Sequence, residues 1–293
     1  MINSHCYDFK LLKNNNKGIL DDFVDATYIL TLVGSERQKH IHEQLKLYTP
    51  TKKIYIVYNQ GYEKCDKVLT EQIHPYDLTD SYLNTINHSL TNNYNNILIL
   101  EDDFIFSPLI KDKSIVKDIH TFFIKNKDKT FYYSLGTAPI LFYPNINIFN
   151  NTFRGIFCVY SHAIIYTKKI QLDIIERKNE NIRSWDVFLT NTYLNYFYKY
   201  PLCYQTFPKT ENQKYWCDNK SKYYCAIENF IVLNFYKILG LDKRPQPGFN
   251  IMYAIGFIKI YSIFLLFTLF LLFIFFKIFN KKNILNVKKY LLK

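Results

Sequence analysis

Residues 97–103 read ILILEDD, a run of four apolar residues that ends directly in three acids. Two other β-rich runs precede it, TYILTLV at 27–33 and KKIYIVYN at 52–59. Between these runs, apolar residues recur at helical spacing in 35–48 and in 77–90. This β-α-β-α-β order predicts an α/β fold with an open, mostly parallel central sheet.

The helix ends and the later part of the chain carry further signals. Ser35 and Gln38 fit a capping box at the start of the first helix, and Asp77 fits the N-cap of the second. Two stretches rich in Tyr, Phe and Ile, 131–144 and 156–167, predict strand pairs.

The three acids after ILIL are Glu101, Asp102 and Asp103. In open α/β sheets, ligands bind beyond the carboxyl ends of the strands. Consecutive carboxylates at such a strand end repel one another unless a cation lies between them, and their oxygens are ligands that hard divalent cations prefer. The residues alone leave two interpretations open, a divalent-cation site and an ordinary acidic turn or helix N-cap.

A further helix is predicted near residue 185, where Trp185, Phe188, Leu189 and Tyr193 have helical spacing. Asp186 falls in its first turn. A carboxylate at that position can compensate the helix dipole, or it can act as a general base.

The order of these motifs resembles glycosyltransferase family 25, a group of GT-A enzymes that includes lipooligosaccharide and collagen galactosyltransferases and more distant viral relatives. The resemblance covers residues 26–216 but finds no counterpart for 104–130, and a C-terminal anchor is not a general feature of the family. It is carried by YILTLVGSERQKHI, IYIVYNQGYEKC, LILEDDF, YSHAIIYTKK, and WDVFL followed by YPLCYQTFP.

The resemblance implies a Rossmann-like GT-A catalytic domain that uses Mn²⁺ or Mg²⁺. The implied reaction moves a sugar from a nucleotide-sugar donor, expected to be UDP-linked, to a glycan or glycoprotein acceptor with inversion at the anomeric carbon. Glu101, Asp102 and Asp103 would hold the metal and the donor, with Asp103 as the most direct ligand. Arg37 and Asn59, which follow the first and second strands, are further donor-binding candidates.

Asp186 matches the late aspartate of the family and is the candidate base, so Asp186 and Asp103 are the expected catalytic residues. His162 is a weaker candidate for a metal ligand, because a histidine in a strand is usually structural. Other residues with the chemistry of a sugar-binding surface are Trp185, Tyr204, Gln205, Thr210, Glu211, Asn212 and Trp216.

The C-terminal region predicts a single membrane span. Residues 251–277 are almost entirely apolar, and the 26 residues at 251–276 reach roughly 39 Å in a helix, enough to cross a hydrocarbon core of about 30 Å. We therefore expect an N-terminal arm, a catalytic domain, a linker, the span and a basic tail, at 1–24, 25–235, 236–250, 251–277 and 278–293.

The formal net charge of +12 is unevenly distributed. Six lysines lie in the last 17 residues without an acid among them, which leaves 31 basic against 25 acidic residues elsewhere. Half of the excess charge thus belongs to a tail, so nucleic-acid binding is not favoured.

The topology stays open at this point. The tail lysines place the tail in the cytosol by the positive-inside rule. The first 18 residues, however, lack the apolar core of a signal peptide, and a terminal anchor without a signal usually leaves the bulk of a protein in the cytosol.

The six cysteines include no CxxC pair, so a zinc site is not expected. We expect buried, reduced thiols, with a Cys217–Cys225 bridge as the alternative for an extracytoplasmic domain. Two other functions compete with glycosyl transfer. One is a metal-dependent nucleotidyl- or phosphotransferase, although the chain lacks a GxxxxGK[ST] loop. The other is a non-catalytic membrane protein, for example a viral one, with a decayed transferase domain.

Overall fold

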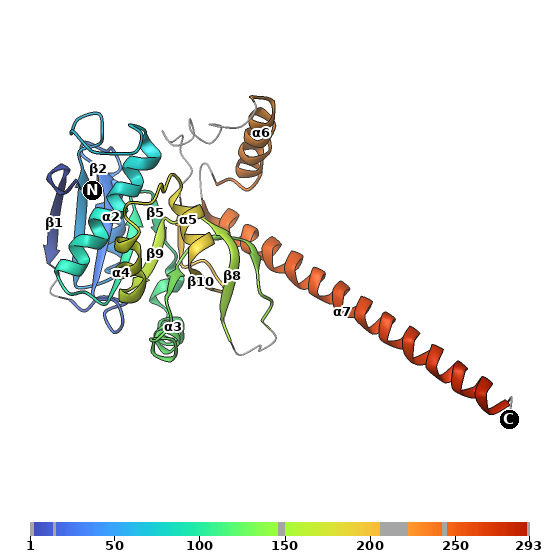
Figure 1. Cartoon of the computed structure of the whole chain (residues 1–293). Helices are drawn as coiled ribbons and strands as arrows, with labels where there is room; N and C mark the ends of the chain where they lie inside the picture. Colours follow the sequence, from blue (N-terminus) through green and yellow to red (C-terminus); the bar gives the residue numbers. More distant parts are fainter. Residues whose placement is uncertain (1–2, 14–15, 146–149, 206–221, 242–244, 292–293) are drawn as a thin grey trace.

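The computed structural model describes residues 3–13, 16–145, 150–205, 222–241 and 245–291. In these ranges the chain is a mixed α/β protein with a large central sheet and one long C-terminal helix (Figure 1). The strands are β1 Tyr7–Lys13, β2 Ala26–Leu32, β3 Lys53–Asn59, β4 Asn96–Glu101, β5 Phe104–Phe106, β6 Phe131–Ser134, β7 Ala138–Phe142, β8 Thr152–Val159, β9 Ala163–Thr167, β10 Leu194–Tyr198 and β11 Cys203–Gln205.

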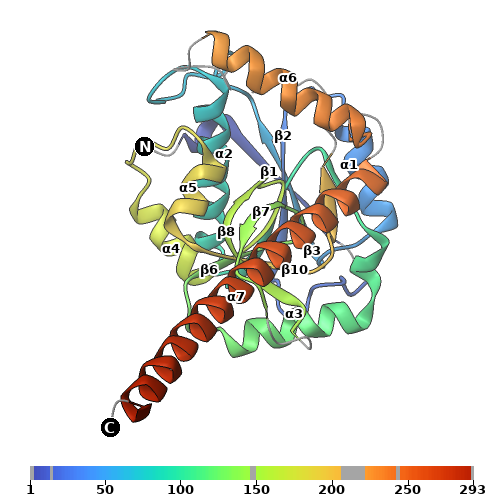
Figure 2. The ribbon, with the colours of Figure 1, turned by 90° about the vertical axis from the view of Figure 1, so that its right-hand side faces the viewer.

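Helices cover both faces of this sheet. Helices α2, α4 and α5 contribute to one hydrophobic layer, while α1 and α3 contribute to the other (Figure 2). The helices are α1 Gln38–Leu47, α2 His74–Thr91, α3 Lys113–Lys125, α4 Lys168–Glu176, α5 Trp185–Thr192, α6 Lys222–Ile238 and α7 Pro245–Leu291, with short 3₁₀ turns η1 Ser4–Cys6 and η2 Pro108–Lys111.

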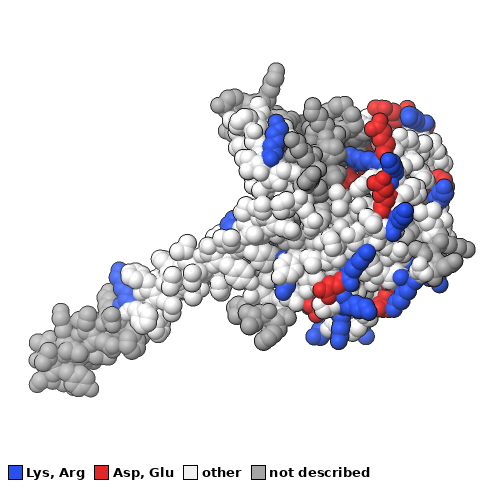
Figure 3. All heavy atoms as spheres, turned by 180° about the vertical axis from the view of Figure 1, so that it is seen from behind, with Lys and Arg blue, Asp and Glu red and all other residues white. Residues whose placement is uncertain are grey.

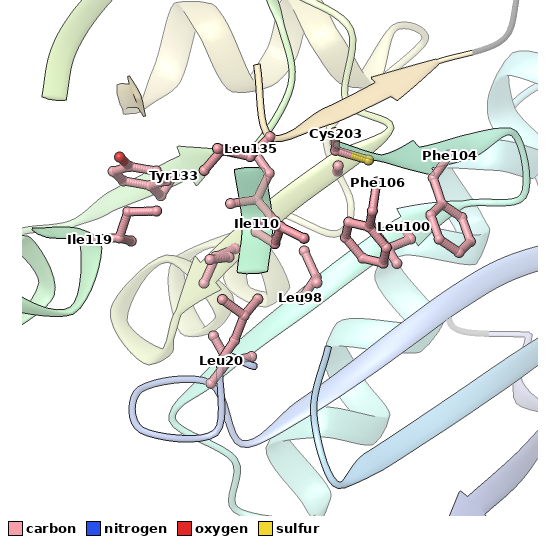
Figure 4. Close-up of a cluster of buried hydrophobic side chains, with 14 of the residues drawn as sticks. Leu20, Leu98, Leu100, Phe104, Phe106, Ile110, Ile119, Tyr133, Leu135 and Cys203 are labelled. Carbon is pink, nitrogen blue, oxygen red and sulfur yellow. The ribbon is translucent and has the colours of Figure 1, made fainter. Parts of the chain in front are cut away.

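The first half of the sheet has the predicted arrangement. Strand β2 lies between β3 and β4 and is parallel to both, and helices α1 and α2 form the two crossovers. Alternate residues of β4 enter opposite cores, with Leu98 and Leu100 on one face and Ile97 and Ile99 on the other. Figure 4 shows Leu98 and Leu100 packed near Phe104 and other side chains of the first core. The apolar run is therefore buried on both sides, as a central strand requires.

The prediction of a mostly parallel sheet was wrong. In the described part of the chain the order is β1-β3-β2-β4-β9-β6-β10-β8-β7, and only β3/β2, β2/β4 and β6/β10 pair in parallel. The stretches 131–144 and 156–167 do form strands, but β6 pairs with β9 and β10, while β7 pairs with β8. An apolar run predicts burial of a strand, but it does not specify the direction or the partner of that strand.

The N-terminal residues belong to the sheet. Strand β1 pairs antiparallel with β3 along its whole length, from Tyr7 opposite Asn59 to Lys13 opposite Lys53. The structure thus differs from the boundary expected at residue 25. A disulfide also joins Cys6 to Cys65, so the expectation of reduced thiols was wrong for this pair. The two cysteines are 59 residues apart, and the β1/β3 pairing helps to bring them together.

The cysteines after residue 65 were expected to be reduced, with one alternative bridge. Cys158 and Cys203 are free and buried, as expected. The alternative Cys217–Cys225 bridge lies outside the described residues.

Two predicted helix caps were also wrong. The N-cap of α1 is Arg37, without a side-chain cap, and the hydroxyl of Ser35 accepts from the Arg37 backbone N–H at 3.2 Å and donates to Asp102. Helix α2 begins at His74, so Asp77 lies inside its first turn and is buried.

Helix α7 projects from the globular part (Figure 1). Its first turns pack under β7 and β8, where Phe249, Met252 and Tyr253 are buried. From Ser262 to Ile278 the side chains are mostly apolar and exposed, and Figure 3 shows the described part of this projection as mainly white. By length and composition, Gln246–Ile278 is able to cross a membrane.

Candidate active site at the end of β4

The three acids lie at the carboxyl end of β4, where the fold gathers polar groups from several elements. Glu101 is the last residue of β4, and Asp102 and Asp103 form the turn before β5. The residues around them come from the end of β2, the loop before α1, the β8–β9 connection, the first turn of α5, and β11.

Asp102 is held by three donors from the first βα unit. Thr31 Oγ1 and Ser35 Oγ donate to Asp102 Oδ2 at 2.9 and 3.2 Å. Arg37 Nη1 donates to Oδ1 at 2.6 Å. The carboxylate is thereby fixed at the site entrance, because three directed hydrogen bonds leave it little rotational freedom.

Asp103 is the most buried of the three acids, with 3% of its side chain exposed. Gln205 Nε2 donates to its Oδ2 at 3.1 Å, and Arg37 Nη1 lies 3.7 Å from the same oxygen. Burial raises the pKa of Asp103 to about 6, while the charge of Arg37 opposes the increase. A negative charge here is costly unless another cation approaches.

Glu101 points toward the opposite side of the site. Its Oε1 accepts hydrogen bonds from Tyr82 Oη at 2.7 Å and from Ser161 Oγ at 3.0 Å. Burial raises the pKa of Glu101 to about 8, and the nearby charges of Asp103 and Asp186 contribute in the same direction. Without a cation, burial therefore favours the protonated form of this carboxyl group.

Asp186 lies in the first turn of α5, as predicted, and the fold brings it to the Glu101 side of the site. The backbone N–H of Tyr160 donates to its Oδ2 at 3.0 Å. Its Oδ1 is buried and has no hydrogen-bond partner in the described part of the chain. Burial raises the pKa of Asp186, so the carboxylate is a stronger base than an exposed one.

The surroundings of Asp186 have two unusual features. Tyr160 has a φ of +78°, a conformation that a non-glycine residue rarely adopts and that concentrates at functional sites. Asp186 also borders a cavity of about 10 Å³, the space of roughly one water molecule. Polar groups of Ser134, Thr137, Thr190 and Asn195 line the same cavity.

The carboxylates of Glu101, Asp102 and Asp103 have the chemistry of ligands for a divalent cation, and such a cation could also bind a substrate. Burial and mutual repulsion raise the pKa values of Glu101 and Asp103, and a cation would offset both effects. Among the described residues, however, the three potential ligands whose atoms all lie within 4.8 Å of one another are His5, Cys6 and Cys65, not the three acids. The arrangement therefore suits one or two carboxylates supplemented by phosphate oxygens, the usual mode for Mg²⁺-type sites.

Asn59 does not join this site. Its Oδ1 accepts from Lys67 Nζ at 2.7 Å, and its Nδ2 donates to Asp77 and Ser81. Both ends of the amide are thus occupied in a separate buried cluster.

The other candidates have mainly structural surroundings. His162 is fully buried, its Nε2 lies 3.3 Å from the carbonyl of Cys203, and burial lowers its pKa to about 4. Trp185 stacks on Tyr82, and Tyr204 is 1% exposed, so neither offers a surface to a sugar. Trp216 and the segment 210–212 lie outside the described residues.

Several residues of the site were not predicted from the sequence. Thr31, Ser35, Tyr82 and Ser161 each bond to an acid of the cluster. The hydroxyl groups at the end of β2 were a usable signal, because that strand ends beside β4. Tyr82 and Ser161 carry no such signal, since only the packing of α2 and β9 brings them to Glu101.

The chain is thus a mixed α/β protein with a large central sheet and an acidic cluster at the carboxyl end of β4. No family model and no curated protein sequence matches it. Solved structures that it resembles include A197 from STIV, with 13% identity, a TM-score of 0.39, and coverage of 64% of this chain and 86% of that one. A glycosyltransferase involved in the glycosylation of the major capsid of PBCV-1 shares 15% identity over 53% of this chain and 67% of that one, with a TM-score of 0.29. Both TM-scores are below 0.5, so the argument for function rests on the residues of this chain.

Proposed function

We propose that the protein is a membrane-anchored, metal-dependent glycosyltransferase. It would move a sugar from a nucleotide-sugar donor, UDP-linked in our proposal, to a glycan or protein-linked acceptor. The observation that carries the proposal is the buried Asp103 beside Asp102 and Arg37 at the carboxyl end of β4. This group offers carboxylates to a cation and a guanidinium to a diphosphate within one site.

Each residue has a distinct role in this proposal. Asp103 and Asp102 bind Mn²⁺ or Mg²⁺, which neutralises negative charge on the departing diphosphate. Arg37, fixed by Asp102, orients the diphosphate. Glu101 contacts the donor as a hydrogen-bond partner, and its raised pKa lets it donate as well as accept.

Asp186 is the proposed general base. An acceptor hydroxyl that attacks the anomeric carbon loses its proton as the new bond forms, and a carboxylate within about 3 Å can take it. The raised pKa of Asp186 and its hydrogen bond to the Tyr160 amide support this role. Direct attack by the acceptor inverts the anomeric centre, so no nucleophile from the chain is required.

The membrane anchor is α7. We propose that the exposed apolar part of this helix crosses a bilayer once and that the packed first turns hold the globular part close to it. The apolar side chains beyond Tyr261 would otherwise be exposed to water over many turns.

The test is a screen of UDP-, GDP- and CMP-sugars with the full chain in detergent and Mn²⁺. We expect hydrolysis or transfer with a UDP-sugar, stabilisation against heat by UDP with Mn²⁺, and at least a hundredfold loss of activity in Asp103→Asn. Asp128→Asn, at an exposed position, is the matched control. A wild-type protein that shows neither turnover nor stabilisation with any donor contradicts the proposal.

A further inference from the structure

The disulfide near the N-terminus is informative about the side of the membrane on which the globular part lies. Cys6 ends η1 and is fully buried, and Cys65 follows β3 in the chain. Their sulfur atoms are bonded, and their Cα atoms are 5.9 Å apart. This spacing is typical of natural disulfides, so the pair needs no movement of the backbone to close.

The two cysteines are held together by more than their own bond. Strand β1 follows Cys6 directly and pairs with β3 over seven residues. Lys67, two residues after Cys65, donates to Tyr7 Oη at 2.6 Å and to Asp77 at 2.5 Å. Asn3 Nδ2 donates to Asp80 Oδ1 at 3.0 Å. The fold therefore presents the two thiols to each other whenever it forms.

Such a pair becomes oxidised where the surroundings allow it and remains reduced in a cytosol that maintains thiols. The other cysteines with described side chains, Cys158 and Cys203, are both buried, so the described surface offers no free thiol to an oxidising environment. The lysines of 277–293 give an independent indication, because an excess of positive charge next to a span stays in the cytosol.

We propose that α7 is inserted with its lysine-rich end in the cytosol and the globular part on the opposite, oxidising side of the membrane, where the Cys6–Cys65 disulfide forms. This inference rests on the anchor in the proposed function, but it does not depend on the reaction. If both hold, the acceptor is displayed on the oxidising side, and a transport step must supply the nucleotide-sugar there.

The first experiment maps the thiols in cells that express the full chain. Free thiols are blocked with N-ethylmaleimide before lysis, and the peptides are identified without reduction. We expect at least tenfold more Cys6–Cys65 linked peptide than blocked Cys6. Blocked thiols at both positions would overturn the proposal. Thiols that become reactive only after a chelator is added would also overturn it, because His5, Cys6 and Cys65 would then be metal ligands.

The second experiment tests orientation in sealed membrane vesicles with the cytosolic side outward. A protease should remove an epitope placed after residue 293 and leave the globular part intact until detergent is added. Digestion of the globular part in sealed vesicles would overturn the proposal.

Two controls separate this proposal from the others. Extraction at alkaline pH that releases the chain from the vesicles would show that α7 is not an anchor, and would overturn both the anchor and the orientation. Cys158→Ser should leave the linked peptide unchanged, since Cys158 is buried and free. Activity toward UDP-sugars is not a readout in either experiment, so the proposed reaction can fail while the orientation holds.

Discussion

Two clusters of buried charge lie near the ends of β3 and β4, the strands on either side of β2, and they differ in how their charge is balanced. At the end of β3, Lys67 is fully buried and sits 2.5 Å from Asp77 and 3.5 Å from Asp80. At the end of β4, Glu101, Asp102 and Asp103 have Arg37 as their contacting cation among the described residues, and Arg37 is 32% exposed.

The difference separates a structural cluster from a binding site. The Lys67 cluster supplies its own cation, and Tyr7 and Asn59 complete the hydrogen bonds of the ammonium group. In the β4 cluster, burial raises the pKa values of Glu101 and Asp103 instead. Among the described residues, the first cluster has its own counter-charge, whereas in the second the raised pKa values show that a further cation would stabilise the carboxylates.

Replacing Lys67 breaks the balanced cluster and should have the largest effect. Lys67→Met leaves Asp77 and Asp80 buried without their counter-charge, which costs about 3–5 kcal/mol in comparable cases. We expect a loss of that size in the free energy of unfolding, measured by denaturant titration in detergent. Lys64→Met, at an exposed position nearby, should change it by less than about 0.5 kcal/mol.

A second variant keeps this prediction specific. Adding Asp77→Asn to Lys67→Met should recover part of the loss, because one of the two uncompensated charges is removed. A loss below about 1 kcal/mol in the single variant would show that the cluster relaxes or admits water.

The two halves of the sheet differ in how well the sequence predicted them. The runs that became β2, β3 and β4 were predictable, because strands and crossover helices alternate there with clear periodicity. The second half was not, since β6 to β10 are apolar strands whose order depends on contacts between distant segments. Strand β1 was missed although YDFKLLK alternates apolar and polar residues from Tyr7 to Leu11, the pattern of a half-buried strand.

The candidate site was predictable only as far as it is local in sequence. The acid cluster follows a recognisable strand, and Arg37 follows another, so both could be named in advance. Asn59 was placed in the site by the same reasoning, but Lys67 draws it into the other cluster. That pairing could not be foreseen, because a buried lysine looks like a surface lysine in a sequence.

When no metal is present, the free energy of unfolding should depend on pH through Glu101 of the β4 cluster. Glu101 has an ordinary pKa of 4.5 and a folded pKa of about 8, so the folded state holds a proton that the unfolded state releases between these values. This contribution to stability is complete below about pH 4.5 and is lost as the pH rises through 8. The slope is at most about 1.4 kcal/mol per pH unit for one group.

The measurement is thermal or denaturant unfolding in EDTA from pH 5 to pH 8. Wild-type protein should lose stability across this range, and Glu101→Gln should show a flatter profile. Glu63→Gln, at an exposed position, should keep the wild-type slope. A Glu101→Gln profile that matches wild type would mean that Glu101 is ionised in the folded protein without a metal.

Removing Arg37 should sharpen the comparison, because it takes away the cation that contacts Asp102 and Asp103 in the described part of the chain. Because Arg37 is partly exposed, Arg37→Met should change the free energy of unfolding by less than about 1 kcal/mol. Affinity for UDP should fall about tenfold, since a diphosphate loses its guanidinium partner. Affinity for Mn²⁺ should not fall, because the cation that contacts Asp102 and Asp103 among the described residues is removed. Calorimetric titration measures both, with Lys39→Met as the exposed control on the same helix.

The smallest expected effect concerns Ser35. A role as the cap of α1 and a role as a hydrogen-bond donor to Asp102 predict different effects of Ser35→Ala on stability and on turnover. As the cap of α1, its loss would lower the free energy of unfolding by about 1 kcal/mol and leave turnover unchanged. In the structure its hydroxyl accepts from the Arg37 backbone N–H at 3.2 Å and donates to Asp102 Oδ2 at 3.2 Å, while Thr31 and Arg37 hold the same carboxylate. Ser35→Ala should therefore reduce kcat/KM with the active donor by less than about fivefold, because two of three donors remain. Its unfolding free energy should change less than that of a true cap variant, and the reverse pattern would assign Ser35 to the helix rather than to the site.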